Sequence, residues 1–163
     1  MSGLRDQLLE RFRGRVCLMG IGNLDYGDDG FGVRLAQAVA NRVDAEVVVA
    51  EATPERHLNA MNGDSCDELV FLDAVECGQP AGSVVFLDAG EIAHRFPQVS
   101  THKVALSTLS QWAQANGIKK TWLLGAQPET LAAGSKLSAP VEQTIAALTA
   151  LLTDISSEVR RCP

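Results

Sequence analysis

The sequence predicts a three-layer α/β/α protein whose five-stranded mixed sheet is mostly parallel, with one strand antiparallel. Short apolar runs alternate with longer segments of helical periodicity, which is typical of parallel strands joined by crossover helices. A glycine-rich loop, residues 20–32, lies between the first apolar run and the first long helical pattern. This strand–loop–helix order is where α/β proteins commonly open a binding crevice. At 163 residues the chain is expected to form a single domain, residues 1–163.

Apolar runs predict the strands. In chain order the expected strands are residues 15–19, 45–50, 69–72, 83–87 and 121–126. The second run is continuously apolar, so we expect it to be buried on both faces of the sheet. Between the third and fourth strands lie only nine residues, 74–82, with two glycines and a proline. That connection is too short for a crossover helix, so the fourth strand should run antiparallel to the third.

Apolar spacing and helix start and stop signals predict the helices. The expected helices are residues 2–12, 30–43, 54–62, 103–116 and 138–155. Thr53-Pro54 is a helix-start signal, and Gly117 is a typical C-terminal cap. We expect an irregular segment from His94 to Thr101, a loop over residues 128–136 and a frayed tail after Ser157.

Composition excludes several classes of protein. The net charge of −6 and the pI near 5.0 argue against nonspecific nucleic-acid binding, which needs a basic face. No run of about 18 apolar residues is present, so no membrane span is expected. The charged N-terminus lacks the apolar core of a secretory signal. The four cysteines show no CxxC spacing, and Cys17 is expected to be a buried core residue. A cytoplasmic location fits these features.

The glycine-rich loop is better suited to a cation than to a phosphate. It contains five glycines together with Asp25, Asp28 and Asp29. These carboxylates would repel a polyphosphate at close range. The dinucleotide-binding fingerprint also fails, because its sixth position is Asp25 instead of glycine. A nucleotide or flavin binder is therefore disfavoured, although an absorbance scan of the purified protein would test it.

Two aspartates and a histidine form a plausible set of ligands for a divalent metal. Asp29 follows the first strand, Asp73 ends the third, and His102 precedes the helix expected from residue 103. If the second strand flanks the first on the side away from the third, both aspartates face one crevice. These residues also have structural alternatives. Asp28 or Asp29 could be the N-cap of the following helix, Asp73 could cap a turn, and His102 could be a capping or surface residue. His57 and His94 are expected to be ordinary surface residues.

Other hydrolytic chemistries find less support. An aspartic-protease pair would need Asp-Thr/Ser-Gly twice, whereas the sequence has Asp29-Gly30 and Asp73-Ala74. The G-x-S-x-G turn of serine hydrolases is absent. Neither Cys66 nor Cys77 has a histidine nearby in the sequence that would mark a thiol nucleophile.

Four ordered motifs resemble those of the [NiFe]-hydrogenase maturation endopeptidases, the peptidase A31 type. The motifs are Gly20-Ile21-Gly22-Asn23 with Asp28-Asp29-Gly30-Phe31-Gly32, Phe71-Leu72-Asp73-Ala74, Ser100-Thr101-His102, and Leu124-Gly125-Ala126-Gln127-Pro128-Glu129 followed by Leu137-Ser138. The resemblance extends from about Arg15 to Leu152. It implies a five-stranded mixed sheet with one antiparallel strand, in which the fifth strand can lie between the third and the fourth.

The resemblance also implies a function and a site. Members remove a C-terminal peptide from the precursor of the hydrogenase large subunit after nickel insertion, so that precursor is the expected partner. Asp29, Asp73 and His102 carry over as the metal-contacting residues. The nickel would be supplied by the substrate, whose cysteines already hold it. No separate nucleophile is assigned, and we expect a monomer.

Two further residues are candidates for substrate contact. Glu51 stands where the family often carries an Asp-Gly-Gly turn, and it can substitute for that acid. Gln127 lies near the end of the fifth strand and could face the same crevice, although a role as a turn partner is equally compatible. The alternative function, from a different class, is a noncatalytic maturation factor that binds a metal or metalloprotein on the same scaffold.

Overall fold

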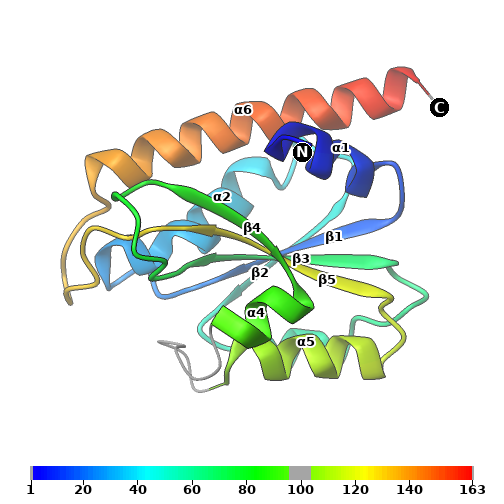
Figure 1. Ribbon diagram of the computed structural model, residues 1–163, viewed down its shortest axis with the longest axis horizontal. Helices are drawn as coiled ribbons and strands as arrows, with labels where there is room; N and C mark the ends of the chain where they lie inside the picture. Colours follow the sequence, from blue (N-terminus) through cyan, green and yellow to red (C-terminus); the bar gives the residue numbers. More distant parts are fainter. Residues whose placement is uncertain (1, 96–103, 163) are drawn as a thin grey trace.

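The computed structural model describes residues 2–95 and 104–162 and contains one five-stranded sheet (Figure 1). The strand order across the sheet is β2-β1-β3-β5-β4. The strands are β1 (Val16–Ile21), β2 (Glu46–Glu51), β3 (Glu68–Ala74), β4 (Val84–Asp88) and β5 (Lys120–Ala126). β1 pairs in parallel with both β2 and β3, and β3 pairs in parallel with β5.

Three expectations about strand order are confirmed. β4 is antiparallel, β5 lies between β3 and β4, and β2 flanks β1 on the side away from β3. The expectation that the second strand is buried on both faces is wrong. β2 is an edge strand, and its Val47, Val48 and Val49 are only partly buried because no strand covers its outer side.

Helices cover both faces of the sheet, which confirms the three-layer architecture (Figure 1). One face packs against α1 (Leu4–Phe12), α2 (Phe31–Val39) and α6 (Ala139–Arg161). The other packs against α3 (Pro54–Leu58), α4 (Ala89–Arg95) and α5 (Leu106–Ala115). Each face has its own apolar core, and the fully buried Cys17 belongs to the second one, as expected. Over the described ranges, no helix has the length and apolar character needed to cross a bilayer.

The structure corrects four predictions about the helices. His94 lies in α4, where no helix was expected. Asp88 and Glu91 exchange backbone-to-side-chain hydrogen bonds of 2.9 Å at its start, the reciprocal pattern of a capping box. The tail after Ser157 is helical through Arg161 instead of frayed, because α6 continues to pack against α1. α2 and α3 end four residues earlier than expected.

The amino-terminal edge of the sheet is held by an ion-pair cluster of Arg15, Asp67 and Lys119. Arg15 Nε and Lys119 Nζ lie 3.1 and 2.9 Å from the Asp67 carboxylate. The Asp67 backbone N–H also donates to the Arg15 carbonyl at 2.8 Å, and its carbonyl accepts from the Lys119 N–H at 2.8 Å. The hydrogen bond from Arg15, followed by that from Lys119, lowers the pKa of Asp67 to about 2. This cluster joins the segments that precede β1, β3 and β5.

Asp67→Asn should reduce stability in a pH-dependent way. Because the folded-state pKa is about 2 and the ordinary value is 3.8, the stabilisation is present above pH 3.8 and disappears as the pH falls towards 2. Urea unfolding measured from pH 7 to pH 2 should give wild type a larger free energy of unfolding than the variant at neutral pH. This difference in free energy should disappear between pH 3.8 and pH 2. An equal difference at both ends would contradict the assignment. Added salt should narrow the neutral-pH difference, since the cluster is solvent-exposed.

Candidate functional site

The topology brings Asp29 and Asp73 to one edge of the sheet. β1 and β3 are adjacent and parallel, so their carboxyl ends lie side by side. Asp29 belongs to the 3₁₀ turn Gly27–Gly30 that follows β1, and Asp73 is the penultimate residue of β3. The sequence-based expectation that both aspartates share one edge is therefore met, and this is the edge where α/β sheets bind ligands.

Glycines allow the start of α2 to lie directly on the strand ends. A Cβ atom on Gly32 would stand 1.9 Å from the Leu72 carbonyl oxygen and 2.6 Å from that of Ile21. A Cβ on Gly22, whose φ is +144°, would stand 1.9 Å from the Asp29 carbonyl oxygen. Any side chain at either position would push the 3₁₀ turn off the sheet. The glycines of this loop thus allow its backbone to pack directly against the strand ends, and phosphate binding is not needed to explain their presence.

Asp29 is buried and oriented by the backbone of its own loop. Its side chain is 5% exposed, and Oδ2 accepts a 2.9 Å hydrogen bond from the Asn23 N–H. A backbone donor of this kind fixes the rotamer of the carboxylate. Such outer partners are typical of carboxylates that act as metal ligands.

Asp73 lies on the α5 side of the sheet. It is 3% exposed and pairs with Gly125 of β5. Side chains alternate along a strand, so it shares a face with Phe71 and Val75, both of which belong to the core beneath α4 and α5. α5 is the helix that follows residues 96–103 in the sequence. Asp73 therefore lies on the sheet face that this helix covers.

His102 lies outside the described residues, between the end of α4 at Arg95 and the start of α5 at Leu106. Its place as a third ligand stays a prediction. Within the described ranges, no group of three His, Cys, Asp or Glu side chains is arranged to hold a metal ion. A three-residue site at this edge therefore depends on His102.

Sequence reasoning missed the role of Asp28. It is completely buried, and its carboxylate accepts hydrogen bonds from the N–H groups of Glu129, Thr130 and Ser138 and from the Ser138 hydroxyl. These partners lie more than a hundred residues away, so only the option that Asp28 caps its own helix was visible locally. Ser138 starts α6 as expected, but its hydroxyl serves Asp28 instead of capping the helix.

Glu51 ends β2 beside the glycine-rich loop. Its carbonyl oxygen accepts from the Gly22 N–H at 3.0 Å, and its side chain is exposed. With φ of +55°, it is the one non-glycine residue in the left-handed region among the described residues. That conformation costs a non-glycine residue on the order of 1 kcal/mol. A side chain retained at such a position is a candidate for function.

Gln127 is held by the loop that joins β3 to β4. Its Oε1 accepts from the N–H groups of Cys77 and Gln79 at 2.8 and 3.4 Å. Its Nε2 donates to Glu76 Oε2 at 2.8 Å and to the Pro128 carbonyl at 3.2 Å. The side chain is 6% exposed, so these contacts match the turn-partner alternative for this residue.

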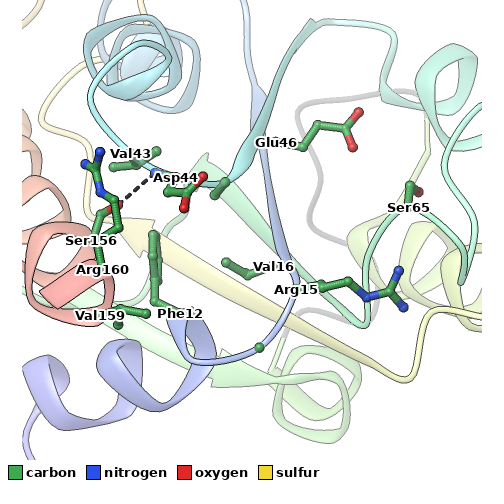
Figure 2. A pocket seen from close by; sticks show the side chains of 12 residues that line it. Phe12, Arg15, Val16, Val43, Asp44, Glu46, Ser65, Ser156, Val159 and Arg160 are labelled. Carbon is green, nitrogen blue, oxygen red and sulfur yellow. Dashed lines mark hydrogen bonds between the residues drawn. The ribbon is translucent and has the colours of Figure 1, made fainter. Parts of the chain in front are cut away.

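A hollow of about 430 Å³ lies at the opposite edge of the sheet (Figure 2). Phe12, Val16 and Val159 line its apolar part, and the Asp44 N–H donates to Ser156 Oγ at 2.7 Å beside it. It is formed where β1 and β2 begin, whereas Asp29 and Asp73 lie where β1 and β3 end. The hollow is therefore separate from the aspartate edge.

Comparison with known proteins decides the family. A family model described as hydrogenase maturation protease matches residues 33–155, about three quarters of the chain. The chain belongs to this family. The matched region begins just after the glycine-rich loop and includes Asp73 and His102. Family membership supports a role in hydrogenase maturation and a peptidase activity.

Individual relatives agree with this assignment. The Hydrogenase 3 maturation protease of Escherichia coli (strain K12) is 27% identical over 130 residues, which cover 78% of this chain and 82% of that protein. The crystal structure of the [NiFe] hydrogenase maturation protease HycI from Thermococcus kodakarensis KOD1 superposes with a TM-score of 0.82 at 26% identity, over 93% of this chain and 99% of that one. The hydrogenase maturating endopeptidase HybD from E. coli shares the fold, with a TM-score of 0.72 at 24% identity over 90% and 93% of the chains.

Gly32→Ala should destabilise the fold more than an ordinary glycine substitution. The added methyl group meets a rigid backbone carbonyl, so we expect a loss of about 3 kcal/mol or more in the free energy of unfolding. Urea denaturation measures it. Gly14→Ala is the control, because its Cβ would make an ordinary 3.7 Å contact and should change stability by less than about 1 kcal/mol. Equal effects of the two substitutions would refute the close-packing account.

Proposed function

We propose that this protein is an endopeptidase that removes the C-terminal extension of a [NiFe]-hydrogenase large-subunit precursor after nickel insertion. The observation that carries the proposal is the placement of two buried aspartates, Asp29 and Asp73, at the ends of adjacent parallel strands in a chain of this family. With His102 they would supply two carboxylates and one imidazole.

This donor set suits nickel that arrives with the substrate. Carboxylates and imidazole bind divalent metals without enclosing them as a four-cysteine site does, so the metal can keep ligands from a second protein. In this proposal the precursor's own cysteines hold the nickel, and Asp29, Asp73 and His102 contact it from the enzyme side. A precursor without nickel would lack the atom that these side chains recognise.

Contact with the metal would also place the bond to be cleaved. Gripping a fixed atom in the substrate sets the register of the nearby peptide chain, and correct register accounts for much of the rate of many enzymes. A divalent metal can in addition polarise a carbonyl group or a water molecule. The enzyme's own contribution is to hold the carboxylates still, which the Asn23 N–H does for Asp29.

Glu51 is proposed to contact the substrate beside this site. It stands on the same edge, where its carbonyl group is bonded to the loop that carries Asp29. Its exposed carboxylate is available to a donor on the precursor. For Gln127 we propose an indirect role, because its amide group is used in holding the β3–β4 connection next to Asp73.

Removal of any proposed ligand should abolish processing while the fold survives. Asp29→Asn is the sharpest variant, since its amide oxygen can still accept from Asn23 while the charge is lost. With Asp73→Ala and His102→Ala, we expect losses of about a hundredfold or more in kcat/KM. Mass spectrometry of nickel-loaded and nickel-free precursor measures release of the C-terminal peptide. Asp67→Asn, the same chemical change at the opposite edge, should process normally.

The outcomes separate the competing functions. Cleavage of the loaded precursor alone supports both the peptidase and its nickel recognition. Equal cleavage of both forms refutes nickel recognition. Binding of the loaded precursor by wild type without cleavage would favour the noncatalytic maturation factor. Normal processing by all three ligand variants would overturn the site.

Glu51→Gly should separate the side chain's function from its backbone cost. Glycine accepts φ of +55° without strain but loses more entropy on folding, so stability should change by less than about 1 kcal/mol. Processing should fall several-fold because the carboxylate is gone. Glu51→Gln retains the shape of the side chain, so its processing rate should lie between those of wild type and Glu51→Gly. Undiminished processing by Glu51→Gly, measured by the same mass-spectrometric assay, would remove Glu51 from the substrate site.

A further inference from the structure

Asp28 makes far more contacts than a residue that only starts a helix. A typical N-cap side chain accepts one or two bonds from its own helix. The Asp28 carboxylate instead accepts four bonds, of 2.7 to 3.2 Å, from a different part of the chain. Three donors are backbone N–H groups, of Glu129, Thr130 and Ser138, and the fourth is the Ser138 hydroxyl. The last residue is the N-cap of α6, so the charge also lies at the favourable end of that helix.

Backbone contacts join the same two segments. The Asp28 N–H donates to the Thr130 carbonyl at 2.9 Å, and the Gly134 N–H donates to the Asp25 carbonyl at 2.7 Å. A Cβ on Gly27 would stand 2.3 Å from Ser135 Oγ, so the two segments touch without a gap. The glycine-rich loop and residues 128–138 therefore form one unit, which we call the double loop.

The consecutive acids Asp28 and Asp29 bond to different segments of this unit. The Asp28 side chain reaches into residues 129–138, whereas Asp29 Oδ2 accepts from Asn23 within the glycine-rich loop. Both belong to a 3₁₀ turn of only four residues, so a rotation of one displaces the other.

We propose that Asp28 is a positioning residue that acts through Asp29, by fixing the 3₁₀ turn against residues 129–138. The inference rests on the proposed function. Without the carboxylate, the N–H groups of Glu129, Thr130 and Ser138 lose their acceptor, and the loss of these bonds favours opening of the double loop. Asp29 then loses its fixed direction and its bond to Asn23 weakens, although neither of these two residues is changed.

The test is Asp28→Asn, examined first without any substrate. Asparagine keeps the shape of the side chain, but its NH₂ group is a hydrogen-bond donor and would face N–H donors of residues 129–138 where Asp28 has an acceptor oxygen. Amide hydrogen exchange by NMR should show faster exchange at Glu129 and Thr130. It should also show roughly tenfold faster exchange at Asn23, whose N–H reports the Asp29 carboxylate. With nickel-loaded precursor, kcat/KM should fall on the order of tenfold to a hundredfold.

Asp67→Asn is the matched control, since it makes the same substitution at the opposite edge and also removes bonds between distant segments. It should leave the Asn23 exchange rate and kcat/KM at wild-type values. An unchanged Asn23 rate in Asp28→Asn, or an unchanged kcat/KM, overturns the positioning role. Failure of wild type to cleave any precursor refutes the proposed function instead, and the Asn23 readout then still decides whether Asp28 holds Asp29.

A second variant covers the case in which Asp28→Asn does not fold. Ser138→Ala removes one of the four donors and keeps the backbone N–H. It should raise the Asn23 exchange rate and lower kcat/KM in the same direction, by a smaller factor. Wild-type behaviour of Ser138→Ala in both measurements would then overturn the inference.

Discussion

The approach of the Gly32 backbone to the Leu72 carbonyl group determines the arrangement of this end of the molecule. There is no room for a methyl group between the Gly32 backbone and the Leu72 carbonyl oxygen, so α2 begins directly on the ends of β1 and β3. The turn that precedes α2 must then lie over the strand ends, and it carries Asp29 with it. The position of Asp29 relative to Asp73 is thus fixed by main-chain packing, and a close-packed interior leaves it little freedom to shift.

In the proposed function, the neighbouring acids Asp28 and Asp29 have different roles in an open metal-recognition site. A site that meets its metal on another protein cannot rely on the metal to organise it beforehand, so its ligands must be held by the fold. Asn23 orients Asp29 locally, and residues 129–138 hold the turn from a distance through Asp28. Exposed Glu51 lies on the same edge and is bonded to the same loop.

The features that depend on local chemistry were predictable from the sequence. The nine residues between β3 and β4 are too few for a crossover, which predicted the antiparallel strand. The placement of Asp29 and Asp73 at one edge of the sheet was predictable, because each comes after an apolar run that predicts a strand. The bonds of Asp28 to Ser138 were not, because they join residues 110 positions apart and no local pattern marks them. α4 did have a signal, the spacing of Asp88 and Glu91, which is the D-x-x-E form of a capping box.

α6 carries the chain away from the aspartate edge. It begins at Ala139, beside the double loop, and its 23 residues span roughly 34 Å. Its last turn, near Arg160, lines the hollow at the far edge, and α1 packs along the same helix (Figure 1). An affinity tag or surface tether joined at the end of α6 would therefore leave the aspartate edge open to a partner as large as a hydrogenase subunit, so the immobilised protein could be used to capture it.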